Sequence, residues 1–136
     1  MGHIKKMMFT FLLVLIVNLV LGNSVNAQTG PEIKKADKLF GGAWVNKRTT
    51  RHLRIFIEKD GYVTINDWTS KKQKQEEGDA YKAYIKKGKL IMPEDLEHHT
   101  PYSEMQVKDN TLIYITIFKD NEGKQITDKE FFVKEL

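Results

Sequence analysis

The chain of 136 residues contains no cysteine, three prolines and no apolar run long enough to span a membrane. The absence of cysteine excludes disulfides, thiol catalysis and a lipid anchor on cysteine. The longest apolar stretch, from Met7 to Leu21, holds 15 residues, which is short of the roughly 20 that a transmembrane helix needs. A folded domain in this chain must therefore be stabilised by burial of apolar side chains.

Residues 1–27 have the three zones of a bacterial-type secretion signal. A basic start, MGHIKK, precedes the apolar run, and the segment ends in Val25-Asn26-Ala27. We predict a cleavable signal peptide over 1–27, which leaves residues 28–136 as a single domain with no stable membrane anchor. The protein is expected to be exported and to be periplasmic or secreted.

A strong net charge is also lacking once the leader is removed. The leader contains Lys5 and Lys6 and no acidic residue, so the formal charge falls from +4 to +2. A nearly neutral domain lacks the broad cationic field that nucleic-acid binding requires. We expect no nucleic-acid partner.

Alternation of apolar and polar residues dominates the predicted domain. A helical period is confined to residues 32–40, and Gly41-Gly42 follows as a stop signal. Elsewhere the period is two, which is typical of strands. We therefore predict an all-β domain with one short N-terminal helix, an antiparallel meander of about eight strands closed or nearly closed into a small barrel. An open curved sheet or a sandwich is the alternative.

Turn residues set the expected register of the first clear hairpin, at residues 51–68. A two-residue turn at Asp60-Gly61 would mix its two faces. A three-residue loop with Gly61 in the left-handed conformation instead pairs Ile57 with Val63 and gathers the aliphatic side chains on one side. We predict the three-residue loop.

The same reasoning is applied to the hairpin at residues 102–118. A three-residue loop ending at Asn110 places Met105 opposite Ile113. Ile113, Ile115 and Ile117 are then predicted to face the interior. Two polar segments, 69–80 and 93–101, are predicted to be irregular connections.

The tripeptide Gly42-Ala43-Trp44 opens the first predicted strand, directly after the helix. Here the chain resembles the lipocalins and related calycin barrels, which open with G-x-W, and GAWVN at 42–46 is also similar to the first strand of the avidins. The resemblance implies that Trp44 is a structural plug at one end of the barrel, with Lys134 as the nearest candidate for a cation over its face. A barrel of this size either keeps a cavity or is filled by its own side chains.

Aromatic side chains occupy the other face of the first hairpin. With the predicted register, the side away from the aliphatic residues carries His52, Phe56, Tyr62 and Trp68. One interpretation is that the helix or a loop packs over these residues. The other is that they bind a ligand or a protein partner, with tryptophan and tyrosine as anchors.

Candidate catalytic and metal-ligating residues are sparse after residue 27. Ser70, Ser103 and three histidines are present without the spacing of a known nucleophile motif. One loop contains the ligand-type residues Glu94, Asp95, Glu97, His98 and His99 and is a weak metal candidate, and a solvated acidic loop is the favoured interpretation. We predict no catalytic residue and no cofactor.

Three functions follow from these patterns. The first is an exported, non-enzymatic, lipocalin-like binding protein that recognises a small molecule or an envelope component. The alternative is a protein-interaction or inhibitor domain of the bacterial envelope, and the second alternative is a metal-assisted enzyme centred on His98 and His99. A hollow barrel would favour the first function, and a filled barrel would count against it.

Overall fold

The computed structural model describes residues 29–136, and the predicted signal peptide lies outside them. The first element is helix α2, Gly30–Phe40. Thr29 begins it as the N-cap, since its side chain accepts a hydrogen bond from the Glu32 backbone while the Glu32 carboxylate accepts one from Thr29. Ala36 and Phe40 are its buried residues.

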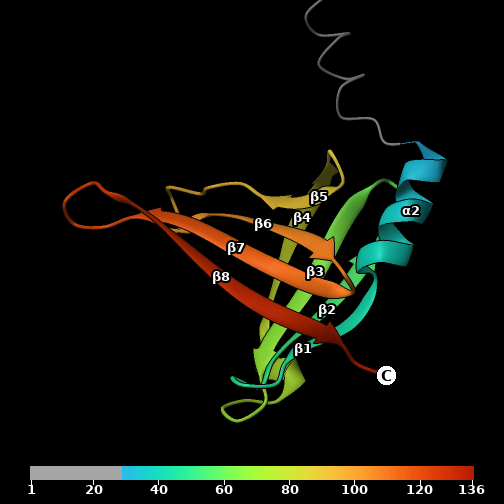
Figure 1. Cartoon of the computed structure of the whole chain (residues 1–136), viewed down its shortest axis with the longest axis horizontal. Coiled ribbons are helices and arrows are strands. Elements are labelled where there is room, and N and C mark those ends of the chain that lie inside the picture. Colours follow the sequence, from blue (N-terminus) through green and yellow to red (C-terminus); the bar gives the residue numbers. More distant parts are fainter. Residues whose placement is uncertain (1–28) are drawn as a thin grey trace, which may run out of the picture.

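Within the described residues, eight antiparallel strands form a closed barrel in which each strand pairs with its sequence neighbours and β1 pairs with β8 (Figure 1). This confirms the predicted fold class: all-β, one short helix and a closed meander. The strands are β1 Gly42–Asn46, β2 Arg51–Ile57, β3 Tyr62–Thr69, β4 Asp79–Lys86, β5 Lys89–Met92, β6 Tyr102–Lys108, β7 Thr111–Lys119 and β8 Gln125–Lys134.

The register predicted for the first hairpin is confirmed. Ile57 pairs with Val63, and Ile55 pairs with Ile65. Gly61 has a φ of 89° and ends the loop between β2 and β3. A residue with a side chain rarely adopts this conformation, so glycine at this position fixes the loop length and thereby the face of each strand.

The register predicted for the hairpin of β6 and β7 is wrong by one residue. Lys108 pairs with Thr111, so the turn contains two residues, Asp109 and Asn110, with φ values of 52° and 61°. Two successive residues with positive φ define the tight turn that matches the twist of a hairpin, and Asp and Asn tolerate it better than most side chains. The turn therefore decides the register, against the aliphatic pattern.

This correction reverses the two faces of β7. Leu112 and Tyr114 point into the barrel and are 0% and 8% exposed. Ile113, Ile115 and Ile117 lie on the outer wall instead of facing the interior. Ile113 and Ile117 are partly exposed there, whereas Ile115 is buried, at 8% exposed. Phe131 of β8 extends this outer apolar strip through its pairing with Ile113.

The apolar interior is concentrated at the end of the barrel that α2 covers. Phe40 from α2 and Trp44 from β1 meet there, and both are at most 2% exposed. The side chains around them belong to one continuous core: Leu53, Ile55, Val63, Ile65, Ala83, Ile85, Leu90, Met92, Met105, Leu112 and Phe132. Side chains therefore fill the interior at this end, which we call the helix end.

Of the two irregular connections predicted at the opposite end, the first is more ordered than expected and the second is irregular as predicted. The segment predicted as a loop over 69–80 includes the end of β3, the short helix η1 (Gln75–Glu77) and the start of β4. Residues 93–101 are outside the named strands, as predicted, with a single bridge between Asp95 and Thr100. The β7–β8 hairpin projects as a long arm beyond the other strands (Figure 1).

Candidate functional site

A group of polar side chains fills the barrel interior toward the end away from α2. Arg51, at the start of β2, binds the Asp67 carboxylate with two hydrogen bonds, from Nε to Oδ1 at 2.9 Å and from Nη2 to Oδ2 at 2.6 Å. Its Nη1 donates to Glu130 Oε1 at 2.8 Å. One guanidinium thus joins β2 to β3 and to β8, in the bidentate geometry that suits a carboxylate.

Two tyrosines complete this group. Tyr81 of β4 donates to Asp67 Oδ2 at 2.7 Å, and its hydroxyl lies 3.1 Å from that of Tyr114. The Arg51 guanidinium lies 4.7 Å from the centroid of the Tyr114 ring. We call Arg51, Asp67, Tyr81, Tyr114 and Glu130 the charged network.

Burial and mutual contact shift the ionisation of the charged network. Burial raises the pKa of Tyr81 above its ordinary value, and the neighbouring Tyr114 and Asp67 raise it further. Burial by itself lowers the pKa of Arg51, but its hydrogen bond to Asp67 and the charges of Asp67 and Glu130 outweigh this, so the pKa is raised. The arginine is therefore a permanent cation between two carboxylates.

The charged network closes the second end of the barrel and leaves few polar atoms with which a ligand could bind. Most of its polar atoms are bound to one another. Among the described residues, one buried side-chain oxygen, Glu130 Oε2, has no hydrogen-bond partner. We call this end of the barrel the charged end.

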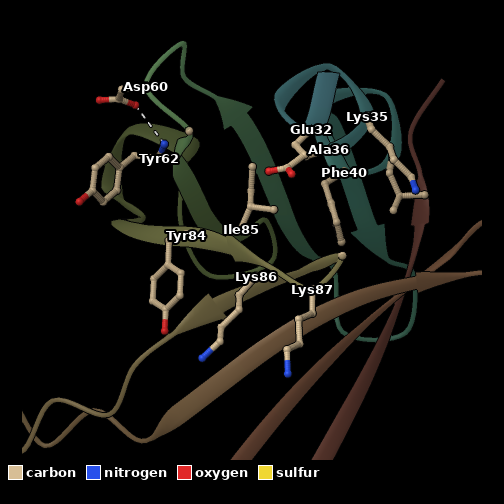
Figure 2. Close-up of a pocket in the computed structure, with 13 residues that line it drawn as sticks. Glu32, Lys35, Ala36, Phe40, Asp60, Tyr62, Tyr84, Ile85, Lys86 and Lys87 are labelled. Carbon is tan, nitrogen blue, oxygen red and sulfur yellow. Dashed lines mark hydrogen bonds between the residues drawn. The ribbon is translucent and has the colours of Figure 1, made fainter. Parts of the chain in front are cut away.

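A pocket of about 780 Å³ lies at the helix end, outside the barrel interior, between α2 and the turns that join β2 to β3 and β4 to β5. Figure 2 shows Tyr62 and Tyr84 on one side, Ala36 and Phe40 of α2 on the other, and Ile85 between them. The remaining lining residues are Glu32, Lys35, Leu39, Asp60, Gly61, Lys86, Lys87 and Gly88.

The walls of this pocket combine a buried apolar floor with exposed polar groups. Ala36, Phe40 and Ile85 are 5%, 1% and 7% exposed. Tyr62 and Tyr84 are 55% and 36% exposed. A concave site with an apolar base and a few polar groups at its edge is the usual form of a small-molecule site.

The structure separates the four residues of the predicted aromatic surface into two places. His52 and Trp68 stack with their ring centroids 5.0 Å apart and their planes at 9°. Phe56 is 44% exposed on the same wall, and the Arg54 guanidinium lies 5.7 Å from the centroid of its ring. Tyr62 lines the pocket beside α2.

His52 also brings Ser70 and Glu135 together. Its Nε2 lies 3.1 Å from Ser70 Oγ, and its Nδ1 lies 3.1 Å from Glu135 Oε1. This is the order of atoms in a serine–histidine–carboxylate triad, although the two serines, taken alone, had no recognisable spacing.

The surroundings of Ser70 do not support catalysis by this arrangement. The Ser70 hydroxyl also contacts the Thr50 carbonyl at 3.3 Å. The backbone N–H groups of residues 70–73 all donate to Thr50 or Thr69. None of these four groups is free to stabilise an oxyanion, which acyl transfer requires.

In the predicted metal loop, the structure brings His98 together with Asp95 and Glu97. Asp95, Glu97 and His98 have ligand atoms within 4.8 Å of one another, and all three side chains are exposed. His98 Nδ1 lies 2.8 Å from Asp95 Oδ2, and this hydrogen bond lowers the pKa of Asp95. Glu94 and His99 are not part of this group. A hydrogen-bonded surface turn is sufficient to explain why Asp95, Glu97 and His98 lie close together.

The predicted plug residues lie together at the helix end. Trp44 is 2% exposed, and its indole Nε1 donates to the Phe40 carbonyl at 2.7 Å. Lys134 pairs with Trp44 across β1 and β8, and its Nζ lies 5.3 Å from the centroid of the Trp44 ring. Gly42 has a φ of 110°, and a Cβ there would lie 3.3 Å from Lys134 Cε, so glycine suits this position.

Comparisons with protein-family models, curated proteins and solved structures find nothing that matches the chain. The resemblance to the lipocalins therefore stays a prediction. Within residues 29–136, no helix has the length and apolar character of a membrane span.

Proposed function

We propose that this chain is an exported, lipocalin-like binding protein that takes a small amphipathic molecule in the pocket between α2 and the two hairpin turns. The observation that carries the proposal is the pocket itself, whose volume of about 780 Å³ lies within the range of roughly 300–1,000 Å³ that holds small ligands. Its floor is built from side chains already ordered by the barrel core.

The filled interior at the helix end counts against a ligand inside the barrel, so the proposed site lies outside it. Trp44, Leu53 and Phe132 occupy the interior at the helix end and are at most 2% exposed. A ligand that entered there would have to displace well-packed core side chains, which is costly. Binding outside the barrel leaves the core intact and uses α2 as one wall of the site.

Binding of phenylnaphthylamine, an uncharged dye that fluoresces in apolar surroundings, tests the proposal. We expect a saturable fluorescence increase with one site per chain. Substituting Tyr62→Ala and Tyr84→Ala together removes one wall of the pocket, and we expect about ten-fold weaker binding.

The matched control is Phe131→Ala, because Phe131 is 56% exposed on the outer wall of β8 and is absent from the pocket lining. We expect this variant to bind the dye as the parent protein does. A lack of saturable binding, or an equal loss in the control, would contradict the proposal.

A second candidate function, a protein-interaction domain, is favoured by the apolar strip on the outer wall of β7 and β8. Phe131 and Val133 are 56% and 40% exposed there, beside outward-facing Ile113. Co-purification from envelope extracts tests it. A partner that is lost with Phe131→Ser and Val133→Ser together, but kept by the two-tyrosine variant, would support this function, and equal recovery by all three proteins would reject it.

A further inference from the structure

The lysines at the edge of the α2 pocket have no partner within the described residues. Lys86 and Lys87 lie side by side at the turn between β4 and β5, whereas the Lys35 side chain on α2 points away from them (Figure 2). All three side chains are exposed. None of them takes part in an ion pair or a hydrogen bond in residues 29–136, unlike Lys89, which lies 3.4 Å from Glu104.

The two carboxylates of the pocket, by contrast, already accept hydrogen bonds from the backbone. Glu32 Oε2 accepts from the Thr29 N–H at 3.4 Å as part of the helix cap. Asp60 Oδ1 accepts from the Tyr62 N–H at 3.0 Å. The Glu32 charge is further offset by the positive end of the α2 dipole.

We infer that the ligand of this pocket is an anionic amphiphile, with an apolar or aromatic body on the floor of Ala36, Phe40 and Ile85 and an acidic head group at Lys86 and Lys87, while Lys35 adds positive charge at the far edge. This inference rests on the proposed function and specifies its ligand class. The head group is a carboxylate, sulfonate, sulfate or phosphate, all of which offer acceptor oxygens to ammonium donors.

Electrostatics favour an anionic amphiphile over a cationic or a neutral one. A cationic amphiphile would place a like charge beside the ammonium groups of Lys86 and Lys87. A neutral one would fill the floor but leave those groups bound only to water. Since each exposed ion pair contributes modestly, we expect the acidic head group to strengthen binding by about ten-fold in total.

Two dyes with the same aromatic body separate the contributions of floor and head group. Anilinonaphthalene sulfonate carries a negative charge that phenylnaphthylamine lacks. We expect the sulfonate to bind about ten-fold more tightly in dilute buffer, and the difference to shrink in about 1 M salt because exposed charges are screened.

Substitution of the three lysines assigns the effect to the pocket. With Lys35→Gln, Lys86→Gln and Lys87→Gln together, we expect the sulfonate to bind no more tightly than the neutral dye, whose own affinity stays unchanged. The matched control is Lys71→Gln, Lys72→Gln and Lys74→Gln, which removes the same charge from the exposed segment after β3. We expect the control to bind both dyes as the parent does.

The outcomes distinguish this inference from the function on which it rests. Saturable binding of both dyes with equal affinity would overturn the anionic ligand class and leave the binding function standing. Failure of both dyes to bind would overturn the binding function. Equal weakening of sulfonate binding by the two triple variants would assign the effect to net charge and would also overturn the inference.

Discussion

The helix end and the charged end of the barrel are closed by opposite kinds of side chain. At the helix end, Phe40 and Trp44 exclude water through apolar contact, with one hydrogen bond from the indole to the Phe40 carbonyl. At the charged end, Arg51 is held between two carboxylates. The helix end therefore depends on the hydrophobic contribution to the folding free energy, and the charged end depends on the electrostatic contribution.

The difference also bears on where a ligand can bind. The charged network uses its donors and acceptors largely on itself, so few are available to a ligand. The helix end keeps its charges outside, on α2 and the hairpin turns, where Lys35, Lys86 and Lys87 have no partner within residues 29–136. The proposed binding site lies at this end, where these lysines are available to a ligand.

Removal of the apolar plug should give the largest effect. Trp44→Ala deletes a side chain that is 2% exposed, and we expect unfolding to become easier by about 3–5 kcal/mol because a cavity replaces the indole. Urea unfolding monitored by circular dichroism measures this. Phe131→Ala, an exposed aromatic on the outer wall, is the control and should change stability by less than about 1 kcal/mol. Similar losses in the two variants would show that Trp44 is not a plug.

A smaller loss is expected from breaking the charged network. Arg51→Met leaves Asp67 and Glu130 without their cation. Since the Arg51 side chain is 24% exposed, we expect about 3 kcal/mol, at the low end of the range for a buried ion pair that loses one partner.

Removal of the whole charged group should recover most of this stability. With Arg51→Met, Asp67→Leu and Glu130→Leu together, no unpaired charge remains, and apolar replacements of a buried ionic group are often neutral or stabilising. The same urea titration compares the two proteins. If the triple variant were less stable than Arg51→Met, the network would contribute through its specific contacts, and the contrast between the two ends would be wrong.

Local signals explain which parts of the fold were predictable. Gly61 fixes the loop of the first hairpin because its φ is positive, and the predicted register there is confirmed. At Asp109-Asn110 the sequence offers no glycine, and the aliphatic alternation of Ile113, Ile115 and Ile117 favoured the wrong register. The turn outweighs the pattern because the outer wall also covers these isoleucines: Ile115 is buried there, and Ile113 and Ile117 are partly buried.

The charged network was missed, although the sequence contains a signal for it. Arg51 has the same parity as Leu53 and Ile55, and Asp67 has the same parity as Val63 and Ile65, so both lie on inward-facing positions. A charged residue at an inward position of a strand calls for a buried partner. Applied to the first hairpin, this rule would have paired Arg51 with Asp67.

Of the exposed residues that line the α2 pocket, the sequence singled out Tyr62 alone as a binding residue. Tyr62 was among the expected binding residues, whereas Tyr84, Lys86 and Lys87 were not. The pocket forms where α2 lies beside two turns that are distant from it in sequence, and periodicity within a segment carries no information about such packing. Its position became visible through the tertiary structure.

The smallest expected effect is a loss of folding stability at alkaline pH, and it should originate at the charged end. Burial raises the pKa of Tyr81 above its ordinary value of 10.0, with Tyr114 and Asp67 raising it further. Above about pH 10 the unfolded chain loses this phenolic proton while the folded protein keeps it, so stability falls as pH rises, by up to about 1.4 kcal/mol per pH unit for each such tyrosine. Below about pH 10 the contribution is fully present.

Tyr81→Phe tests the origin of this slope through urea unfolding between about pH 8 and pH 11. We expect the variant to be less stable near pH 8 by about 1–2 kcal/mol, because Asp67 loses a hydrogen bond, and to lose less stability per pH unit above pH 10. Some slope should remain, since burial also raises the pKa of Tyr114. Tyr62→Phe, at a position 55% exposed, should keep the parent slope. If Tyr81→Phe kept the parent slope too, alkaline unfolding would not originate in the charged network.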